Sequence, residues 1–445
     1  MTVVLDVSSR KTPLIAHGVG FYFPENTGGT EVYVQDLCVE LLQQSLASTV
    51  IAATDLESRE YVWNGVNVLR YPSDWGEDER KRGVSNERLS KFQNLVLERR
   101  PDIFHLHSWT RGSGLIHLAQ VAQLGIPCVV TVHVPSPICM RGTMLLHGRQ
   151  PCDGKILEQR CSKCWAESRG LPRPLAYLVS RLPQMPSLVK IKSRGATLMS
   201  ARSLASAKAR ELHQMSTLCK QIVVPSQWVY DALVTNGIPP AKLTLLRQEV
   251  GTAFRGKVVG RSRRQSKILT IGFAGRLERY KGLHTLVDAM ARIPHQIPIR
   301  LLIAGTGADA SYARYLLKAS TNDKRIELCG PKTHEQIAEF MTEIDVLAVP
   351  SNYMETGPLV VLEAYAAGLP VLGANLGGIA ERIRDGEDGL LLPFNDSTAW
   401  AGAMIRLVTE REFLNHLSSN VRSSRSMKDV ASEMASLYRQ ILQGA

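Results

Sequence analysis

Short runs of aliphatic and β-branched residues alternate with amphipathic helical patterns along the whole chain, and this alternation constrains the fold more than any other feature. The clearest runs begin at Thr49, Ile103, Pro127, Gln221, Lys267, Arg300, Asp345 and Pro370. Strands that alternate with helices form parallel sheets, because a helix returns the chain to the edge from which the next strand starts. The sequence therefore predicts an α/β fold with two Rossmann-like units, one in each half.

Length and composition indicate where these units begin and end. A chain of 445 residues is about three times a typical domain, so we expect two domains of about 200 residues each. The stretch from Gly251 to Ser266 is rich in Gly, Arg and Ser, which is typical of an exposed connection. We predict an N-terminal domain over 1–250, a C-terminal domain over 265–425, and a final helix over 426–445 whose docking surface the pattern leaves open.

The chain carries a net charge of +12, from 53 basic and 41 acidic residues. Such an excess favours anionic partners such as nucleotide phosphates, anionic lipids or nucleic acids. We expect no nucleic-acid partner, because the sequence has no recognition motif and no aromatic stacking platform among its basic residues. It also has neither a secretory signal nor a segment apolar enough to span a membrane. We expect a cytoplasmic protein, either free or bound peripherally to the inner face of the cell membrane.

A helix start in the second half has the character of an anion site. Thr356 or Gly357 can cap this helix, and Pro358 suits its first turn. The backbone N–H groups of Leu359 and Val360 then point out of the helix end toward whatever lies before it. A helix N-terminus of this kind binds phosphate groups.

Two carboxylates flank this helix start. Glu355 lies in the loop before it and Glu363 about one and a half turns inside it, so both can reach hydroxyls of one ligand. An isolated pair of this kind is usually ordinary surface charge. Here, Arg276 and Lys281 follow a predicted strand at the edge where open α/β sheets bind ligands. These two cations are suited to a departing nucleotide diphosphate, because negative charge builds on it during transfer.

The motif Gly-Arg-Leu-x-x-x-Lys-Gly at 275–282, followed by Glu-x7-Glu at 355–363, resembles retaining glycosyltransferase family 4, the glycogen-synthase-like glycosyltransferase group 1. Further matching stretches begin, in the expected order, at Phe23, Pro101, Thr131, Val224 and Pro370. The resemblance implies the GT-B fold, in which an acceptor-binding and a nucleotide-sugar-binding Rossmann-like domain face each other across a cleft. The chain departs from the family at 247–250, where Arg-Gln-Glu-Val replaces the usual Asn-Gly-Val-Asp.

The resemblance also implies roles for the residues singled out above. Arg276 and Lys281 bind the donor diphosphate, Glu363 binds the ribose, and Glu355 holds hydroxyls of the transferred sugar. The helix end formed by Leu359 and Val360 assists in binding the phosphates. These residues form the predicted donor site of the C-terminal domain.

Residues of the first half extend the predicted site. Gly28 and Gly29 precede a helix, so bare backbone can approach a donor phosphate or the acceptor closely. His133 ends an apolar strand and matches a family histidine that hydrogen-bonds the donor sugar, whereas the residue pattern alone favours a structural histidine. His105 and His107 alternate along another strand, and we expect them on opposite faces of the sheet without a catalytic role.

The sequence contains no Asp-x-Asp pair, which metal-dependent transferases use to hold donor phosphates through Mg²⁺ or Mn²⁺. We therefore expect no cofactor for catalysis, and the absence of an obvious nucleophile agrees with the front-face transfer of the family. The predicted activity is retaining, metal-independent transfer of a hexose-type sugar from a UDP- or GDP-sugar. The predicted acceptor is a hydroxyl of a glycan or lipid-linked molecule in polysaccharide or glycolipid biosynthesis. Alternatives are a nucleotide-sugar 2-epimerase with the same fold and a non-catalytic nucleotide-sugar or glycan-binding protein.

Four cysteines form a cluster with the spacing C-x12-C-x8-C-x2-C, at Cys139, Cys152, Cys161 and Cys164. We predict a Cys-rich insertion at about 139–164 in the N-terminal domain. Four thiolates in such a loop-rich segment can close a structural Zn²⁺ site, because little else there orders the backbone. Free thiols, a redox pair and an iron–sulfur cluster are the alternatives.

A basic segment follows the cysteines. From Arg169 to Arg210 there are nine basic residues and no acidic one, interleaved with apolar residues. Such a face can dock on anionic lipid. A lipid-linked acceptor would favour this interpretation. It can equally be the solvated side of ordinary helices whose apolar side is core.

Overall fold

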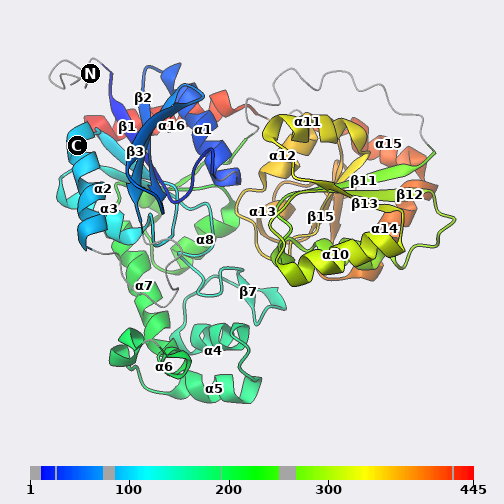
Figure 1. Ribbon diagram of the computed structural model, residues 1–445, viewed down its shortest axis with the longest axis horizontal. Coiled ribbons are helices and arrows are strands. Elements are labelled where there is room, and N and C mark those ends of the chain that lie inside the picture. Colours follow the sequence, from blue (N-terminus) through cyan, green and yellow to red (C-terminus); the bar gives the residue numbers. More distant parts are fainter. Residues whose placement is uncertain are drawn as a thin grey trace. The chain divides into compact units, whose positions relative to one another are not determined.

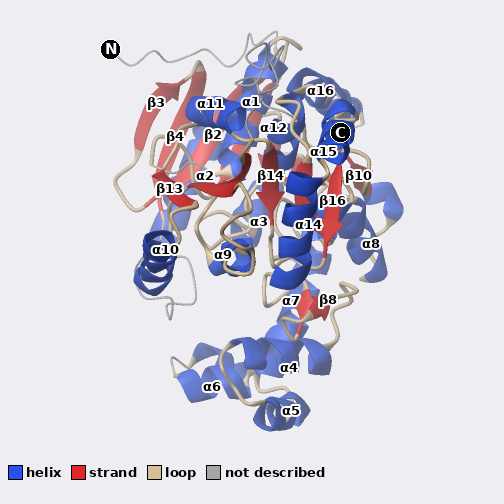
Figure 2. Ribbon diagram, turned by 90° about the vertical axis from the view of Figure 1, so that its right-hand side faces the viewer, coloured by secondary structure: helices blue, strands red, loops and turns tan. Residues whose placement is uncertain are grey.

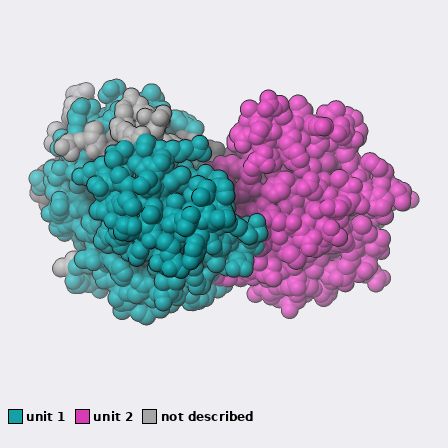
Figure 3. All heavy atoms as spheres, turned by 90° about the horizontal axis from the view of Figure 1, so that it is seen from below, with its two compact units in different colours: residues 1–247, 427–445 teal, residues 248–426 magenta. Residues whose placement is uncertain are grey.

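The computed structural model describes residues 12–25, 28–73, 86–191, 193–249, 267–422 and 425–444. The chain divides into two compact units, which Figure 3 distinguishes by colour. Unit 1 comprises residues 1–247 and 427–445, and unit 2 comprises residues 248–426. The predicted connection at 251–266 lies outside the described residues.

Unit 1 is built on an eight-stranded sheet in the order β10-β9-β6-β5-β1-β2-β4-β3. Neighbouring strands pair in parallel except at the edge, where β3 pairs antiparallel with β4. In sheet order the strands are β10 (Leu243–Leu245), β9 (Gln221–Val224), β6 (Cys128–Thr131), β5 (Ile103–Leu106), β1 (Leu14–Val19), β2 (Ala47–Thr54), β4 (Val66–Pro72) and β3 (Arg59–Trp63). The central strands are buried on both faces, which explains their nearly continuous apolar sequence.

Helices cover this sheet, and the last helix of the chain is one of them (Figure 1). The helices are α1 (Gly29–Leu42), α2 (Asn86–Arg99), α3 (Leu115–Gln123), α8 (Gln227–Thr235) and α16 (Met427–Gln443), with a 3₁₀ turn, η3 (Pro240–Lys242). α16 packs against α1 and buries an apolar face that includes Met434 and Tyr438. The Tyr438 hydroxyl lies 2.6 Å from His105 Nδ1 on β5. The final helix therefore docks on unit 1.

A long insertion separates β6 from β9 in unit 1. It consists of β7 (Leu145–Leu146), β8 (Gln150–Pro151), α4 (Glu158–Ser168), α5 (Arg173–Arg181), η2 (Pro186–Lys190), α6 (Arg194–Met199) and α7 (Ala201–Leu218). α4, α5 and α6 gather into a small helical lobe away from the strands of the unit 1 sheet (Figures 1 and 2). This lobe carries the second half of the cysteine cluster and most of the basic segment.

Unit 2 is built on a six-stranded, fully parallel sheet in the order β13-β12-β11-β14-β15-β16. The strands are β11 (Leu269–Ala274), β12 (Ile299–Ala304), β13 (Ile326–Gly330), β14 (Val346–Val349), β15 (Val371–Ala374) and β16 (Gly389–Leu392). The helices are α9 (Leu283–Met290), α10 (Ala310–Asn322), α11 (His334–Glu343), α12 (Leu359–Ala366), α13 (Gly377–Ala380), α14 (Ser397–Thr409) and α15 (Arg411–Ser419), with a 3₁₀ turn, η5 (Arg279–Lys281). Helices lie on both faces of the sheet (Figure 1). Two doubly wound α/β units confirm the predicted fold class.

Within the described residues, every helix is too short or too polar to cross a membrane.

The hydrogen bond between Tyr438 of α16 and His105 of β5 should stabilise unit 1. Replacing Tyr438 with Phe leaves His105 Nδ1 without its hydroxyl partner, and an unsatisfied buried polar group costs about 1–3 kcal/mol. We expect the Tyr438→Phe variant to lose this much free energy of unfolding in a urea titration. Tyr315→Phe is the matched control, because its hydroxyl bonds to Asp288 at an exposed site, and it should change stability by less than about 0.5 kcal/mol. Equal losses in the two variants would contradict the buried hydrogen bond.

Candidate functional site

The candidate site of unit 2 lies at the carboxyl ends of β11 and β14, where the strand order reverses. β11 and β14 are neighbours, and the chain continues from β11 toward β12 on one side and from β14 toward β15 on the other. The loop at 275–282 follows β11 and the loop at 350–358 follows β14. Loops that diverge at such a point leave a crevice in which α/β sheets bind ligands.

Backbone contacts hold these two loops together. The Asn352 N–H donates to the carbonyl oxygen of Tyr280 at 2.6 Å. Gly282 has a φ of +74°, and a Cβ at this position would lie 1.8 Å from the Pro350 carbonyl oxygen. Only glycine fits there, because both the backbone conformation and the contact exclude a side chain. The glycine of the Lys-Gly pair therefore fixes the place of the lysine beside the second loop.

Glu355 is the best-anchored side chain of the site. Its Oε1 accepts hydrogen bonds from Lys281 Nζ at 2.7 Å and from Ser351 Oγ at 2.7 Å. Its Oε2 accepts from the Tyr353 hydroxyl at 2.5 Å. The carboxylate is almost fully buried, and Lys281 Nζ also lies 3.2 Å from the Tyr353 hydroxyl. The structure therefore joins Lys281 and Glu355, which the sequence placed in separate motifs.

The charge of Glu355 follows from these neighbours. Burial alone would raise its pKa, but the Lys281 ammonium and the hydrogen bonds from Lys281, Tyr353 and Ser351 outweigh burial and hold the pKa below its ordinary value. Glu355 is therefore ionised at neutral pH. A fixed carboxylate of this kind accepts hydrogen bonds from ligand hydroxyls and adds negative charge beside the lysine.

Arg276 presents a second cation on the same loop. Its side chain is 59% exposed, and its Nη1 lies 3.0 Å from Glu278 Oε1. The guanidinium also lies over the ring of Tyr280, 5.6 Å from the ring centroid. An exposed ion pair of this kind contributes little energy, so an anionic ligand can displace Glu278 from the guanidinium.

Glu363 lies on α12, and the structure pairs it with a residue that the sequence analysis missed. His334, the first residue of α11, places its Nε2 3.1 Å from Glu363 Oε1. No sequence signal connects these positions, although the capping box at Thr333 does mark the helix start. The contact orients the Glu363 carboxylate while leaving it partly accessible.

The start of α12 differs from the expectation. The helix begins at Leu359 with Pro358 as its N-cap, and no side chain caps it. The predicted capping by Thr356 or Gly357 is wrong, because Pro358 has a ψ of 93° and so takes the non-helical conformation that a cap residue requires. Leu359 and Val360 keep their predicted place in the first turn, where backbone N–H groups have no partner within the helix.

In unit 1, Gly28 and Gly29 form the start of α1. Gly28 is the N-cap, with no side-chain bond to the helix, and Gly29 is the first helical residue. The side chain of Glu31 lies in this first turn, and a Cβ at Gly28 would be 2.5 Å from its Oε2. An acidic group at this helix end disfavours a second anion there. Binding of the donor by Gly28 and Gly29 stays a prediction.

His133 belongs to a chain of buried histidines in unit 1. His17 Nδ1 lies 3.0 Å from His107 Nε2, and His107 Nδ1 lies 3.1 Å from His133 Nε2. His105 lies beside this chain, with Tyr438 and Thr131 at its two ring nitrogens. Burial lowers the pKa of His133 to about 3 and that of His17 to about 3, so both rings are neutral at neutral pH.

The hydrogen bonds along the histidine chain select one set of tautomers. His17 Nε2 is buried and has no hydrogen-bond partner among the described residues. A proton on that nitrogen would be a buried donor without an acceptor, which costs more than an unused lone pair. The favoured arrangement has His17 Nδ1–H donating to His107 and His107 Nδ1–H donating to His133 Nε2. His133 then carries its own proton on Nδ1.

The expectation that His105 and His107 face opposite sides of the sheet is wrong. Their ring centroids are 3.9 Å apart, because residues two positions apart in a strand point to the same face. His17 was not among the predicted residues, and it reaches the group from the neighbouring strand β1. Only the pairing of β1, β5 and β6 brings these histidines together.

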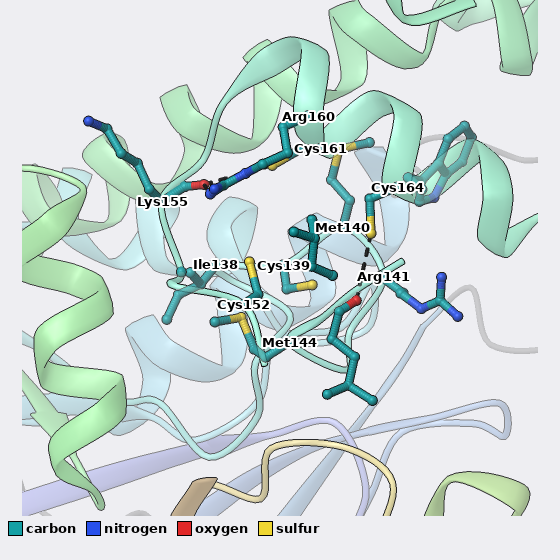
Figure 4. Close-up of a pocket in the computed structure, with 14 residues that line it drawn as sticks. Ile138, Cys139, Met140, Arg141, Met144, Cys152, Lys155, Arg160, Cys161 and Cys164 are labelled. Atoms are coloured by element: carbon teal, nitrogen blue, oxygen red, sulfur yellow. Dashed lines mark hydrogen bonds between the residues drawn. The ribbon is translucent and has the colours of Figure 1, made fainter. Parts of the chain in front are cut away.

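The four clustered cysteines, Cys139, Cys152, Cys161 and Cys164, line a single cavity of about 30 Å³ in the insertion of unit 1 (Figure 4). None of them forms a disulfide. Cys139 and Cys152 come from loops, whereas Cys161 and Cys164 lie on α4. The structure therefore brings the predicted ligand set to one place.

Comparisons with known proteins agree with both units. Residues 258–424 match the family model described as glycosyl transferases group 1, and residues 28–248 match that of a glycosyl transferase 4-like domain. D-inositol 3-phosphate glycosyltransferase of Corynebacterium jeikeium is 33% identical over 421 residues, covering 91% of this chain and 88% of the relative.

Two solved structures show the fold. WaaG, a glycosyltransferase involved in lipopolysaccharide biosynthesis, has a TM-score of 0.65 at 15% identity, covering 95% of this chain and 99% of its own. The Anabaena protein HepE, solved with UDP and glucose, has a TM-score of 0.61 at 15% identity, covering 97% of this chain and 98% of its own. With these matches and the two Rossmann-like units, the chain belongs to the group 1 glycosyltransferases of glycosyltransferase family 4 and is a glycosyltransferase with the GT-B fold.

Proposed function

We propose that this glycosyltransferase moves a hexose-type sugar from a UDP- or GDP-sugar to a hydroxyl of a glycan or lipid-linked acceptor, with retention of configuration and without a metal ion. The observation that carries the proposal is the buried, ionised Glu355 beside Lys281 at the switch point of unit 2. The similarity to HepE, which was solved with UDP and glucose, supports a uridine nucleotide as one candidate donor. Polysaccharide or glycolipid biosynthesis is the proposed setting.

The proposed roles follow from the charges of the site. Lys281 and Arg276 stabilise the negative charge that develops on the departing diphosphate, which is the task of Mg²⁺ or Mn²⁺ in metal-dependent transferases. Glu355 accepts hydrogen bonds from hydroxyls of the transferred sugar and orients its anomeric carbon. Glu363, held by His334, accepts hydrogen bonds from the ribose. In unit 1, we propose that His133 donates its Nδ1–H to a sugar hydroxyl.

The lowered pKa of Glu355 favours transfer over the alternatives. A 2-epimerase needs a base that can take a proton from the sugar ring, and a base works best when its pKa lies near the working pH. Three hydrogen bonds, one of them from the Lys281 ammonium, make the Glu355 carboxylate a weak base instead. A purely binding protein has no need of cations placed for charge that develops only during reaction.

The donor assignment is tested by nucleotide release. We expect one member of a panel of UDP-, GDP- and ADP-sugars to yield free nucleotide diphosphate at a rate that EDTA does not change. Replacing Glu363 with Ala should raise the donor KM about 10- to 100-fold, because a hydrogen bond to a charged group contributes about 1.5–3 kcal/mol.

Glu339→Ala is the matched control, since this exposed glutamate lies on α11 away from the pair, and it should leave the KM unchanged. Loss of activity in EDTA that Mg²⁺ or Mn²⁺ restores would contradict metal-independent transfer. An unchanged KM in Glu363→Ala would contradict the ribose role.

The pairing of Lys281 with Glu355 predicts a pH effect. In Lys281→Met the ammonium no longer lowers the pKa of Glu355, so the carboxylate ionises only at higher pH. We expect the acid limb of the kcat/KM profile to move to higher pH, with kcat about 100-fold lower at its plateau. Lys324→Met, a change at an exposed lysine of unit 2, should leave both unchanged. An acid limb that stays in place would show that Glu355 does not govern it.

We also propose that the lobe around α5 binds anionic membrane. α5 buries Ala176 and Ser180, and on its other faces Leu175 and Leu178 are 49% and 60% exposed. Arg173 and Arg181 begin and end the same helix. Exposed leucines flanked by arginines suit the boundary between lipid headgroups and acyl chains. This placement would bring the enzyme to a lipid-linked acceptor.

Sedimentation with vesicles tests this surface. We expect the full chain to sediment with phosphatidylglycerol-containing vesicles and not with pure phosphatidylcholine vesicles. Replacing Leu175 and Leu178 with Ser should reduce the bound fraction at least about fivefold, because each substitution removes apolar area that the membrane would bury. Leu317→Ser is the matched control, as Leu317 on α10 is also 60% exposed. Equal binding by the double variant and the control would contradict the proposal.

A further inference from the structure

The segment between β6 and α4 has little regular structure of its own. All of residues 132–157 are described, and their strands are the two-residue β7 and β8. The backbone turns through positive φ at Met144 and His147, and also at Gly142, Gly148 and Gly154. Ile138, Met144 and Leu145 are buried, but most other side chains of the segment are partly or fully exposed, and a metal or cross-link can order such loops.

The cavity in this segment joins two parts of the chain. Cys139 and Cys152 approach it from the loops, and Cys161 and Cys164 approach it from α4 (Figure 4). The two helical cysteines are three positions apart, so their side chains leave the helix on the same face. A single ligand in the cavity would therefore tie the loops to the helix.

Burial raises the pKa of Cys152, Cys161 and Cys164, so these thiols stay protonated until a metal ion replaces their protons. Cys164 Sγ accepts a hydrogen bond from the His147 backbone N–H at 3.1 Å. Arg141 and Arg160 line the same cavity, and Arg160 also pairs with Asp153. Four thiolates around Zn²⁺ carry a net charge of −2, and the two guanidinium groups offset much of it. Arg160 keeps its pairing with Asp153, so a zinc tetrathiolate would be a further anionic neighbour for this guanidinium.

We propose that Cys139, Cys152, Cys161 and Cys164 bind one structural Zn²⁺ ion in this cavity. Four thiolates occupy all positions of a tetrahedral site, so the ion has no open position for catalysis. Its effect is to fix the loops 139–152 to α4, and through α4 to fix the lobe that carries α5. The site is independent of the proposed donor site in unit 2.

Zinc binding requires the thiols to move closer together. Within the described residues, His17, His105 and His107 form the one group of three or more ligand side chains whose atoms lie within 4.8 Å of one another. No three of the four cysteine sulfurs therefore lie within 4.8 Å of one another, whereas Zn–S bonds of about 2.3 Å imply about 3.8 Å between all four. Rotation about a Cα–Cβ bond from one rotamer to another moves a sulfur by about 3 Å, so we propose that the site closes by changes of cysteine rotamers.

Cavity size and bonding argue against other occupants. A volume of about 30 Å³ holds about two water molecules, since one needs about 10–15 Å³; an eight-atom iron–sulfur core does not fit. The buried histidine group is a poorer metal site than the cysteines, because His105 uses both ring nitrogens in hydrogen bonds and His107 does the same. A metal ion bound to these histidines would replace hydrogen bonds that their ring nitrogens already form.

Metal analysis of the full chain tests the site. We expect inductively coupled plasma mass spectrometry to find about one Zn²⁺ per chain in protein purified without added chelator. In the Cys161→Ser, Cys164→Ser double variant the ratio should fall to less than about 0.2. Cys329→Ser is the matched control, because Cys329 lies on β13 of unit 2, and it should keep one Zn²⁺.

A second measurement needs no variant. Adding a mercurial reagent to the wild-type protein should release one Zn²⁺ to a metal-sensitive dye, and four thiols should become reactive as the zinc leaves. Bound iron with visible absorbance, a disulfide among these cysteines, or four thiols that react at once with no metal released would each overturn the proposal. None of these readouts depends on the donor or on activity, so failure here leaves the proposed function untouched.

Discussion

The ion pair between Lys281 and the buried Glu355 is the interaction on which the candidate site of unit 2 depends. It joins the loop after β11 to the loop after β14 across the point where the strand order reverses. Removing one partner of such a pair leaves the other buried and uncompensated, which costs about 3–5 kcal/mol. Ser351 and Tyr353 complete the bonds of the carboxylate, so its position and its charge are both fixed before any ligand arrives. Preorganisation of this kind is what transfer without a metal requires.

Unit 1 uses buried polar groups in a different way. Its histidine chain runs across β1, β5 and the end of β6, and Tyr438 of α16 bonds to His105, which lies beside that chain. Neutral rings with fixed tautomers can hold His133 in one orientation without placing a charge in the core. The last helix of the protein therefore contributes to the environment of His105, which lies 333 positions earlier in the sequence. The insertion of the same unit is the opposite case, since its strands β7 and β8 are two residues long and its loops have little regular structure.

The sheets could be predicted well because a buried parallel strand needs a continuous apolar run. The runs at Thr49, Ile103, Lys267 and Asp345 all became strands. β1 was not among the predicted runs, because His17 and Gly18 interrupt its apolar sequence. The histidine chain was therefore not predicted, because it becomes evident only when β1 is placed beside β5.

The candidate site could be predicted only in part. The family resemblance pointed to Arg276, Lys281, Glu355 and Glu363, and the doubly wound fold explains why loops after strands carry them. The direct bond between Lys281 and Glu355 spans 74 positions, and no local pattern reports such a contact. His334 was missed for the same reason, as its pairing with Glu363 depends on how α11 and α12 lie in unit 2.

Hydrogen–deuterium exchange of the full chain with and without UDP and GDP shows whether a nucleotide binds at the switch point of unit 2, and it needs neither acceptor nor turnover. We expect one nucleotide to slow amide exchange in 275–282 and in 350–363, where the Lys281–Glu355 pair and the start of α12 lie. Exchange in the helical lobe that carries α5 should stay unchanged. Protection confined to unit 1, or no protection at saturating concentrations of either nucleotide, would contradict the placement of the donor at the switch point of unit 2.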